Sequence, residues 1–249
     1  MSDSVAPAYA ILGATGGIGS EVCRRLAAGG ARLAIGARDE ARLDDLAAGL
    51  DATARSLDAA DFDAVDAFLG EALERFGRLD GVVNCVGSVY LRPAHLTPAK
   101  DLHSVLATNL VTAFAAVRGA ARRMKQGGSV VLISTAAGRT GLPSHEAIAA
   151  AKGGVEGLVR SAAATYARAG LRVNAVAPGL VETPATERIT SNEAGRAASL
   201  SMHALGRLGR PADVASAIVW LLDPGNDWVT GQVLAVDGGL GSVRVPARG

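Results

Sequence analysis

The chain has 249 residues, of which 49% are hydrophobic and 20% are charged; this composition indicates a globular protein with a large core and excludes disorder. The formal net charge of +1 and the 4% of aromatic residues give no reason to expect nucleic acid or an anionic membrane as a partner. Two distant cysteines, Cys23 and Cys85, form no disulfide framework and no metal motif. Together with a polar N-terminus and no apolar run of membrane-spanning length, they favour the cytoplasm.

Short β-branched runs alternate with longer helical stretches along the whole chain. Asp39 and Asp61 are typical N-caps, and each begins a helix that ends near residues 50 and 76–77, respectively. Two glycines at positions 29 and 30 end the first helix. We therefore expect strands at residues 9–12, 32–36, 81–84, 129–134, 172–176 and 232–236, and helices at 17–28, 39–50, 61–77, 101–125 and 148–169.

This alternation predicts one α/β domain. Uninterrupted apolar runs such as residues 130–133 must be buried on both faces, which requires a parallel sheet with helices on each side. Regular βα alternation favours a doubly wound Rossmann fold; a TIM barrel is the competing architecture, but it does not explain the first turn. No linker or repeat divides the chain, so we expect a single domain over residues 1–249 with short flexible tails at about 1–7 and 243–249.

The turn after the first strand is rich in glycine and predicts a dinucleotide site. Glycines let the backbone approach a pyrophosphate, and the helix that follows directs its N–H groups and positive dipole end at that charge. A tight turn without a ligand is the alternative, but the position between first strand and first helix favours a cofactor. The residues expected to contact it are Gly13, Thr15, Gly17, Ile18 and Gly19.

The end of the second strand indicates which dinucleotide binds. An NAD site places a carboxylate there for the ribose hydroxyls, and that carboxylate would repel the additional phosphate of NADP. This chain has Gly36-Ala37-Arg38 and no acid before Asp39. Arg38 can bind the 2′-phosphate through charge-assisted hydrogen bonds, so NADP is predicted and NAD is the less favoured cofactor.

Five further motifs follow the glycine turn in chain order. They are Leu57-Asp58, Asn84-Cys85-Val86-Gly87, Asn109 within residues 107–110, residues 173–179 through Thr183, and residues 205–211 with 230–239. With the turn, they resemble the short-chain dehydrogenase/reductase family over nearly the whole chain. The resemblance implies an oxidoreductase that uses a nicotinamide dinucleotide, acts on a small molecule and forms a homodimer or homotetramer.

The resemblance also assigns site residues. It places Asp58 at the adenine, and the segment from residue 173 to Thr183 at the nicotinamide carboxamide. The further cofactor contacts that it implies in this chain come from Asn84, Gly87, Lys152, Pro178, Gly179, Val181 and Thr183.

One departure from the family pattern affects the chemistry. The pattern has a hydroxyl residue, a tyrosine thirteen residues later and a lysine four residues after that; with Lys152 as the lysine, these positions hold Thr135 and Ile148. Tyr90 and Tyr166, the neighbouring tyrosines in the sequence, do not fit. Isoleucine cannot donate or accept a proton, and loss of a general acid typically costs about 10²–10⁴ in rate.

Other groups remain as catalytic candidates. Thr135 can hydrogen-bond a substrate oxygen, while the resemblance implies that Lys152 holds the nicotinamide ribose and that Asn109 orders a water. His145 lies seven residues before Lys152, on the helix face that also carries Ile148. Enoyl reductases related to this family have their tyrosine at that position. A histidine without a catalytic role, in a loop after Pro143, is the alternative.

The favoured function is therefore an NADP(H)-dependent oxidoreductase that acts on a small carbonyl or alcohol with a non-standard proton donor. The alternatives are an enoyl-type C=C reductase that uses His145 or water, an inactive NADP-binding or scaffold protein, and a redox-neutral lyase or isomerase. The segments expected to select the substrate, residues 88–98 and 184–205, contain no readable code.

Overall fold

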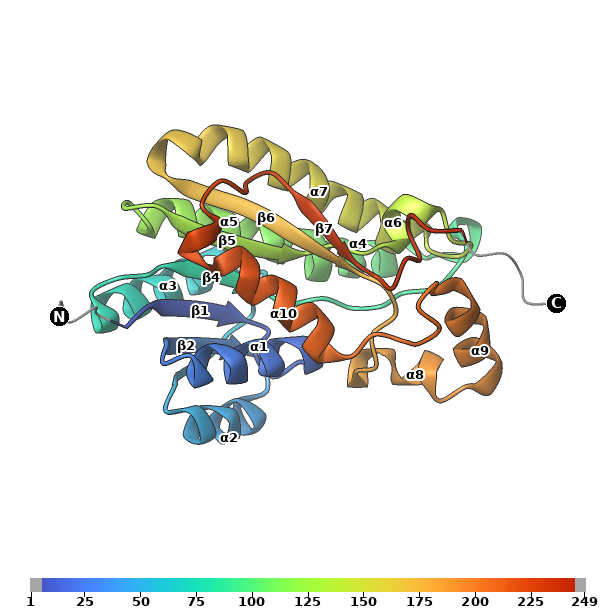
Figure 1. The fold of residues 1–249 in the computed structure, drawn as a ribbon, viewed down its shortest axis with the longest axis horizontal. Helices are drawn as coiled ribbons and strands as arrows, with labels where there is room; N and C mark the ends of the chain where they lie inside the picture. The colour runs from blue at the N-terminus through green and yellow to red at the C-terminus, as the bar shows by residue number, and fades with distance from the viewer. Residues whose placement is uncertain (1–5, 245–249) are drawn as a thin grey trace.

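A computed structural model describes residues 6–244, in which seven parallel strands form one sheet in the order β3-β2-β1-β4-β5-β6-β7 (Figure 1). Most of the two predicted tails, residues 1–5 and 245–249, lies outside the described residues. The single doubly wound α/β domain is confirmed. The strands are β1 (Ala8–Leu12), β2 (Arg32–Ala37), β3 (Thr53–Ser56), β4 (Gly81–Asn84), β5 (Gly128–Ile133), β6 (Leu171–Pro178) and β7 (Val233–Val236).

Helices cover both faces of the sheet, as the apolar strands require. One core lies between the sheet and α1 (Gly17–Ala28), α2 (Glu40–Leu50) and α10 (Pro211–Leu222). The core on the opposite face is formed with α3 (Phe62–Phe76), α5 (Thr112–Arg123) and α7 (Glu146–Tyr166). The shorter helices are α4 (Ala99–Leu106), α6 (Ala137–Thr140), α8 (Glu187–Thr190) and α9 (Glu193–Met202), with a π-helical turn, η2 (Ala107–Val111), and 3-10 turns η1 (Ala94–Leu96), η3 (Ala167–Ala169), η4 (Pro184–Thr186) and η5 (Pro224–Asn226).

The local start signals of the helices are confirmed. The Asp39 carboxylate accepts the N–H of Arg42 at 3.1 Å, and the Asp61 carboxylate accepts those of Asp63 and Ala64, so both aspartates cap their helices. The expected helix at 101–125 begins earlier, at Ala99, and is interrupted by η2. Strand β3 and helices α8, α9 and α10 were not predicted; β3 is a half-buried edge strand that contains Arg55 and has no apolar run.

The chain reverses its direction across the sheet between β1 and β4. From β1 it proceeds outward to β2 and β3, and from β4 it proceeds to β5, β6 and β7. In open α/β sheets the crevice beyond the carboxyl ends of the strands, at such a reversal, is the usual ligand site. Helices α8 and α9 project beyond the sheet in the region where β6 and β7 end (Figure 1).

The expectation that no apolar stretch reaches membrane-spanning length is wrong. Residues Ala99–Arg123 form a continuous helical stretch of 25 residues with mean hydropathy 1.3, long and apolar enough to cross a membrane. Half of its most apolar window is buried inside the protein, and α5 packs against α3 and α7. Burial of this kind is typical of a core helix, so the stretch is weak evidence for a membrane span.

Candidate active site

The glycine turn is held closed at the end of β1. Gly13 and Ala14 donate their N–H groups to the carbonyl oxygen of Gly36 at 2.8 and 3.2 Å, and Gly13 has a φ of 74°. A Cβ at Gly19 would lie only 2.2 Å from the Gly13 oxygen, so the helix can approach the turn only with glycine there. Because the N-cap residue Gly16 has no side chain to cap α1, the N–H groups of its first turn remain available to an anion.

Positive charge gathers beside this turn. Arg38 is exposed directly after β2, and Arg42 in α2 donates from Nη2 to the carbonyl oxygen of Thr15 at 2.7 Å. Asp39, the nearest carboxylate in sequence, accepts the N–H of Arg42 as an N-cap. Asp58 is exposed after β3 and accepts the N–H of Ala60 at 2.9 Å. Arg42 therefore contacts the glycine turn, and Arg38 follows the strand whose Gly36 carbonyl binds that turn.

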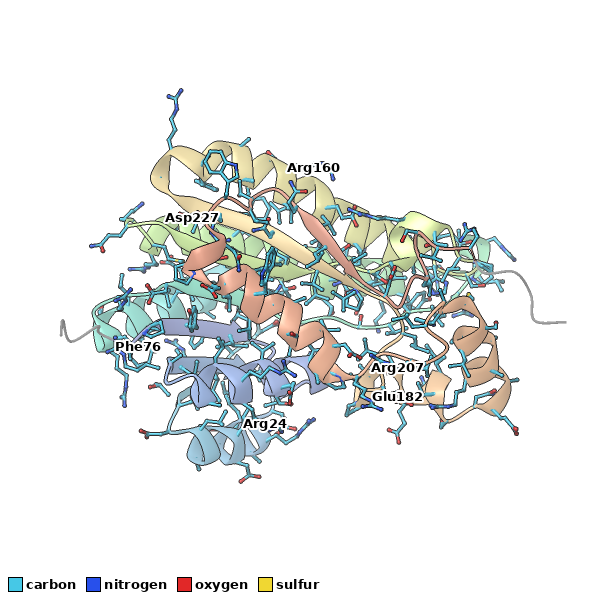
Figure 2. All side chains as sticks on the ribbon, in the orientation of Figure 1. Arg24, Phe76, Arg160, Glu182, Arg207 and Asp227 are labelled. Carbon is cyan, nitrogen blue, oxygen red and sulfur yellow. The ribbon has the colours of Figure 1, made fainter. Side chains whose placement is uncertain are left out.

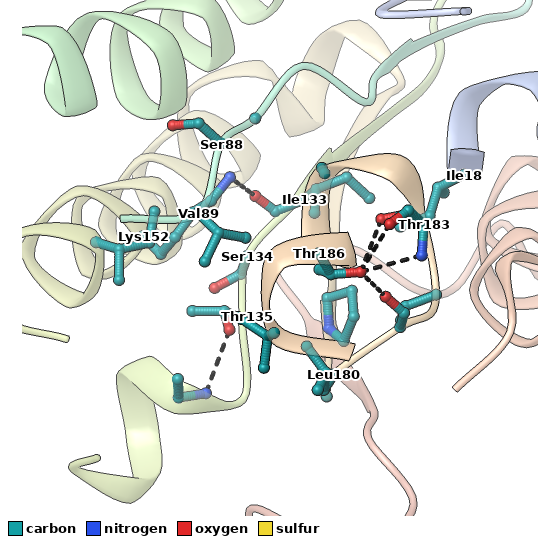
Figure 3. Close-up of a pocket in the computed structure, with 18 of the residues that line it drawn as sticks. Ile18, Ser88, Val89, Ile133, Ser134, Thr135, Lys152, Leu180, Thr183 and Thr186 are labelled. Carbon is teal, nitrogen blue, oxygen red and sulfur yellow. Dashed lines mark hydrogen bonds between the residues drawn. The ribbon is translucent and has the colours of Figure 1, made fainter. Parts of the chain in front are cut away.

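A cavity of about 290 Å³ opens beyond the carboxyl ends of the strands (Figure 3). All four predicted catalytic residues line it: Asn109, Thr135, His145 and Lys152. Among the expected cofactor residues, those that also line it are Gly17, Ile18, Gly19, Gly87, Pro178, Gly179, Val181 and Thr183. Five others are not part of its lining: Gly13, Thr15, Arg38, Asp58 and Asn84.

Lys152 is the buried cation of this cavity. Its side chain belongs to α7, only 5% of the residue is exposed, and its Nζ donates to the carbonyl oxygen of Ile133 at 2.8 Å. Burial lowers the pKa of Lys152 to about 8. An ammonium group has three donors, and the hydrogen bonds within residues 6–244 use one of them, so donors remain for a ligand.

Two asparagines hold the segment after β4 in place. Asn109, in the η2 turn, accepts the Ser88 N–H at 3.1 Å and donates to the Ser88 Oγ and the Val105 carbonyl oxygen, each at 3.0 Å. Asn84 donates to the Thr112 hydroxyl at 3.2 Å and accepts the N–H of Val86 at 3.1 Å. Both side chains bind the protein itself, and thereby position the backbone that borders the cavity.

Ile148 stands where a tyrosine was expected. It lines the cavity, is 6% exposed, and packs in a small cluster with Val105, Ala147 and Ala151. The side chain of Tyr90 belongs to the edge of that cluster, and its hydroxyl donates to Asp101 at 2.9 Å. Among the described residues, no phenol and no carboxylate lines the cavity.

Thr135 and Ser134, adjacent in the chain, have different roles. Thr135 Oγ1 accepts the N–H of Ala137 at 3.3 Å, which leaves its own hydroxyl proton free to donate (Figure 3). Ser134 Oγ donates to the Glu156 carboxylate at 2.9 Å, and Arg139 donates to the same carboxylate. Of these two hydroxyls, Thr135 is therefore the one that a ligand can use.

His145 has a defined tautomer. Its Nδ1 lies 2.8 Å from the carbonyl oxygen of Pro143, and because a carbonyl only accepts, Nδ1 carries the proton. In the neutral ring Nε2 is then an acceptor, and it can donate only from the imidazolium form. This geometry weakens the case for neutral His145 as a hydrogen-bond donor to a substrate.

Several residues that line or flank the cavity were not predicted. His203 is 4% exposed; its Nδ1 donates to the Ser199 carbonyl oxygen at 2.7 Å, and its Nε2 accepts the N–H of Leu180 at 3.1 Å. The role of His203 could not be predicted, because the segment around it contains no recognisable motif. Arg42 had a readable signal, since it lies one helical turn after Arg38. The segments proposed to select the substrate do contribute to the lining, through Ser88, Val89, Leu91, Ala185, Thr186, Ile189, Ser199, Met202 and His203.

Comparisons with known proteins cover nearly the whole chain. A family model described as enoyl-(acyl carrier protein) reductase matches residues 13–241. The cis-4-hydroxycyclohexanecarboxylate dehydrogenase of Sinomonas cyclohexanicum is 37% identical over 98% of this chain and 100% of its own length. The 3-oxoacyl-(acyl carrier protein) reductase of Thermotoga maritima is 36% identical over 92% of this chain and 96% of its own.

Solved structures show the same fold. A short-chain type dehydrogenase/reductase from Mycobacterium ulcerans superimposes with a TM-score of 0.91 at 28% identity, covering 97% of this chain and 92% of that chain. An actinorhodin polyketide ketoreductase solved with NADPH has a TM-score of 0.88 at 30% identity, covering 98% of this chain and 100% of that chain.

The burial of Lys152 predicts a stability effect. At pH 7 the amine is protonated in the folded and the unfolded chain, and its lowered folded pKa means that burying the charge opposes folding. Lys152→Met keeps the aliphatic stem and removes the charge. We expect it to raise the free energy of unfolding of the ligand-free protein by about 1–3 kcal/mol in urea denaturation at pH 7.

The pH dependence provides the control for this prediction. Above pH 8 the folded amine loses its proton, so the free-energy cost of burying the charge falls as the pH rises toward the pKa of a free lysine. Wild type and Lys152→Met should therefore have the same free energy of unfolding by about pH 10.4. Lys100→Met, at an exposed position of α4, should change stability little at either pH. A Lys152→Met protein that is less stable than wild type at pH 7 would contradict the interpretation.

Proposed function

The chain belongs to the short-chain dehydrogenase/reductase family, and we propose that it is an NADP(H)-dependent oxidoreductase that converts a small carbonyl or alcohol without a tyrosine proton donor. The observation that carries this proposal is the composition of one cavity. The first turn of α1, Thr135, Asn109 and Lys152 all line it, and so does Ile148, at the position where the family resemblance places a tyrosine.

The residues of the chain fit a dinucleotide. The uncapped N-terminus of α1 offers N–H groups and a positive dipole end to a pyrophosphate. A Cβ at Gly17 would lie 2.8 Å from Thr183 Cγ2, so glycine there lets the turn approach the loop after β6 closely. Arg38 and Arg42 offer two cations for a 2′-phosphate, which supports NADP over NAD.

In this proposal the reduced nicotinamide supplies a hydride to the carbonyl carbon when bound. The Thr135 hydroxyl donates a hydrogen bond to the carbonyl oxygen, on which negative charge develops. Lys152 binds the ribose hydroxyls and adds a positive charge near the same oxygen. With no phenol or carboxylate in the described lining, the Lys152 ammonium is the acid of the cavity whose pKa of about 8 keeps it protonated at neutral pH. It can thus give the proton that the oxygen takes up, directly or through water, and regain one from solvent.

Enoyl-type C=C reduction is the second candidate. His145 and Lys152 line one cavity, and the matching family model is described as an enoyl reductase. The bond from His145 Nδ1 to Pro143 favours water, rather than the neutral imidazole, as the proton source in this reaction. An inactive NADP-binding or scaffold protein and a redox-neutral lyase or isomerase are the remaining alternatives.

Turnover distinguishes these candidates. We expect slow oxidation of NADPH with carbonyl substrates, measured at high enzyme concentration on parallel panels of ketones and enones, and abolished by Lys152→Ala because the buried cation is lost. Reduction confined to the enones would favour the second candidate, and His145→Gln would then show whether the imidazole contributes. No turnover on either panel, with intact NADPH binding, would favour the inactive protein.

Restoring a phenol tests the missing proton donor. Ile148→Tyr should raise kcat for ketone reduction by about 10²–10⁴, the usual contribution of a general acid. Ile148→Phe is the matched control, because it adds the ring without the hydroxyl and should give no such gain. Equal rates for the two variants would show that the position is not the one from which a proton reaches the substrate.

The arginine pair predicts cofactor preference. Arg38→Ala should raise the Kd for NADPH by about tenfold or more, since charge-assisted hydrogen bonds contribute about 1.5–3 kcal/mol, and should leave the Kd for NADH nearly unchanged. Arg42→Ala should act in the same direction. Fluorescence titration of both cofactors measures this, with Arg160→Ala on the exposed side of α7 as the control (Figure 2). Tighter binding of NADH than of NADPH by the wild type would contradict the assignment.

A further inference from the structure

Part of the cavity lining is apolar. Six side chains form what we call the apolar wall: Val89, Leu91, Leu142, Ile189, Met202 and Leu240. Three of them are large hydrophobic residues left partly open to solvent, with Val89 exposed by 44%, Leu91 by 43% and Met202 by 40%. Partly exposed apolar side chains that converge on one concavity are typical of a ligand site rather than of the general surface.

The apolar wall is assembled from separate parts of the chain. Val89 and Leu91 follow β4, Leu142 follows α6, and Ile189 and Met202 belong to α8 and α9. These side chains add no hydrogen-bonding group to the cavity. Ile148 and Cys85 lower the polarity of the cavity further. Ile148 is apolar, and the Cys85 thiol stays neutral because burial raises its pKa. Val86, by contrast, packs against the core.

Full charges are scarce in this cavity. Among the described residues that line it, there is no arginine, aspartate or glutamate, and Lys152 is the one lysine. The Lys152 Nζ lies at the cofactor side, beside the Ile133 carbonyl and 3.5 Å from where a Cβ of Gly87 would be. Glu182 and Arg207, charged residues in the region of α8 and α10, are each in an ion pair, with Arg196 and Asp213, and are not part of the lining (Figure 2).

The polar side chains of the lining are largely bound to the protein. Both ring nitrogens of His203 have partners, as do Asn109 and Ser134. The Thr183 and Thr186 hydroxyls bond each other. The polar groups of the lining that keep hydrogen-bonding capacity are neutral apart from Lys152: the hydroxyls of Thr135, Ser88 and Ser199 and the Nε2 of His145. Thr135 and Lys152 are the groups assigned to the reacting oxygen. The rest of the substrate would contact the side chains of the apolar wall.

We propose that the apolar wall makes this cavity select uncharged, apolar carbonyl compounds and reject substrates that carry a carboxylate or a phosphate. A carboxylate placed against the apolar wall would lose its hydration without gaining a cation, which is costly. The inference rests on the proposed function, because it names the substrate of that same site. It differs from the substrate that the name of the Sinomonas relative implies, a hydroxycyclohexanecarboxylate.

The test compares three ligands with one carbon skeleton: cyclohexanone, 4-oxocyclohexanecarboxylate and its methyl ester. Binding to the full-length protein, with and without NADPH, is measured by isothermal titration calorimetry, and NADPH oxidation is followed in parallel. We expect the ketone and the ester to bind at least about tenfold more tightly than the carboxylate, and to exceed it by about 100-fold in kcat/KM. A carboxylate that binds as tightly as its ester, or three ligands that all fail to bind at millimolar concentration, would overturn the inference.

The binding readout separates the two proposals. If the ketone and the ester bind but are not reduced, the selectivity stands and the proposed hydride transfer fails. Met202→Arg provides a second variant, since a rim position that is 40% open can accept an arginine. It should improve binding of the carboxylate about tenfold and leave the ester unimproved, whereas Met202→Gln, of similar length without charge, should not favour the carboxylate. No improvement with Met202→Arg would contradict the position of the apolar wall in the substrate path.

Discussion

Backbone contact between the glycine turn and its neighbours is the constraint on which the site depends. Gly13 and Ala14 bond to the Gly36 carbonyl, and a Cβ at Gly13 would lie 2.7 Å from the Val86 nitrogen. The turn thus fits only if β2 and the segment after β4 hold those positions. The same closeness directs the first turn of α1 at the cavity, where its N–H groups can meet an anion.

The loop after β6, which lies against the glycine turn and also borders the cavity, is held by side chains that bind backbone. Thr186 Oγ1 donates to the Val181 carbonyl oxygen at 2.5 Å and accepts the N–H of Thr183 at 3.0 Å, which folds the loop after β6 back on itself. His203 bonds Leu180 and Ser199 and so ties that loop to the end of α9. A Cβ at Gly179 would lie 2.5 Å from His203 Nε2, so this junction also requires a glycine. The glycine turn and the loop after β6 therefore each contain a position, Gly13 and Gly179, at which a larger residue would collide with its neighbours.

Local signals in the sequence predicted most of the fold, and non-local contacts explain what they missed. Asp39 and Asp61 cap helices through bonds to residues two or three positions away, so their effect is readable from the chain alone. The role of His203 depends on Leu180, 23 residues earlier, and no local pattern indicates that pairing. Strand β3 likewise forms because β2 lies beside it, not because residues 53–56 are apolar. The η2 turn, which directs Asn109 at Ser88, also carries no sequence signal.

The missing phenol and the apolar wall have a common electrostatic consequence. Burial without an opposing carboxylate in the described lining is what lowers the pKa of Lys152, and the same low polarity disfavours any second charge that a substrate would bring. In the proposed reaction a neutral carbonyl would enter at no such cost and would acquire negative charge on its oxygen only as hydride arrives. The ammonium then acts on the transition state more than on the ground state, which is the condition for accelerating the chemical step. Ile148 has no group that can donate a proton, but its buried, apolar side chain lowers the polarity of this part of the cavity, and a buried cation acts over a longer distance in such surroundings than it would in water.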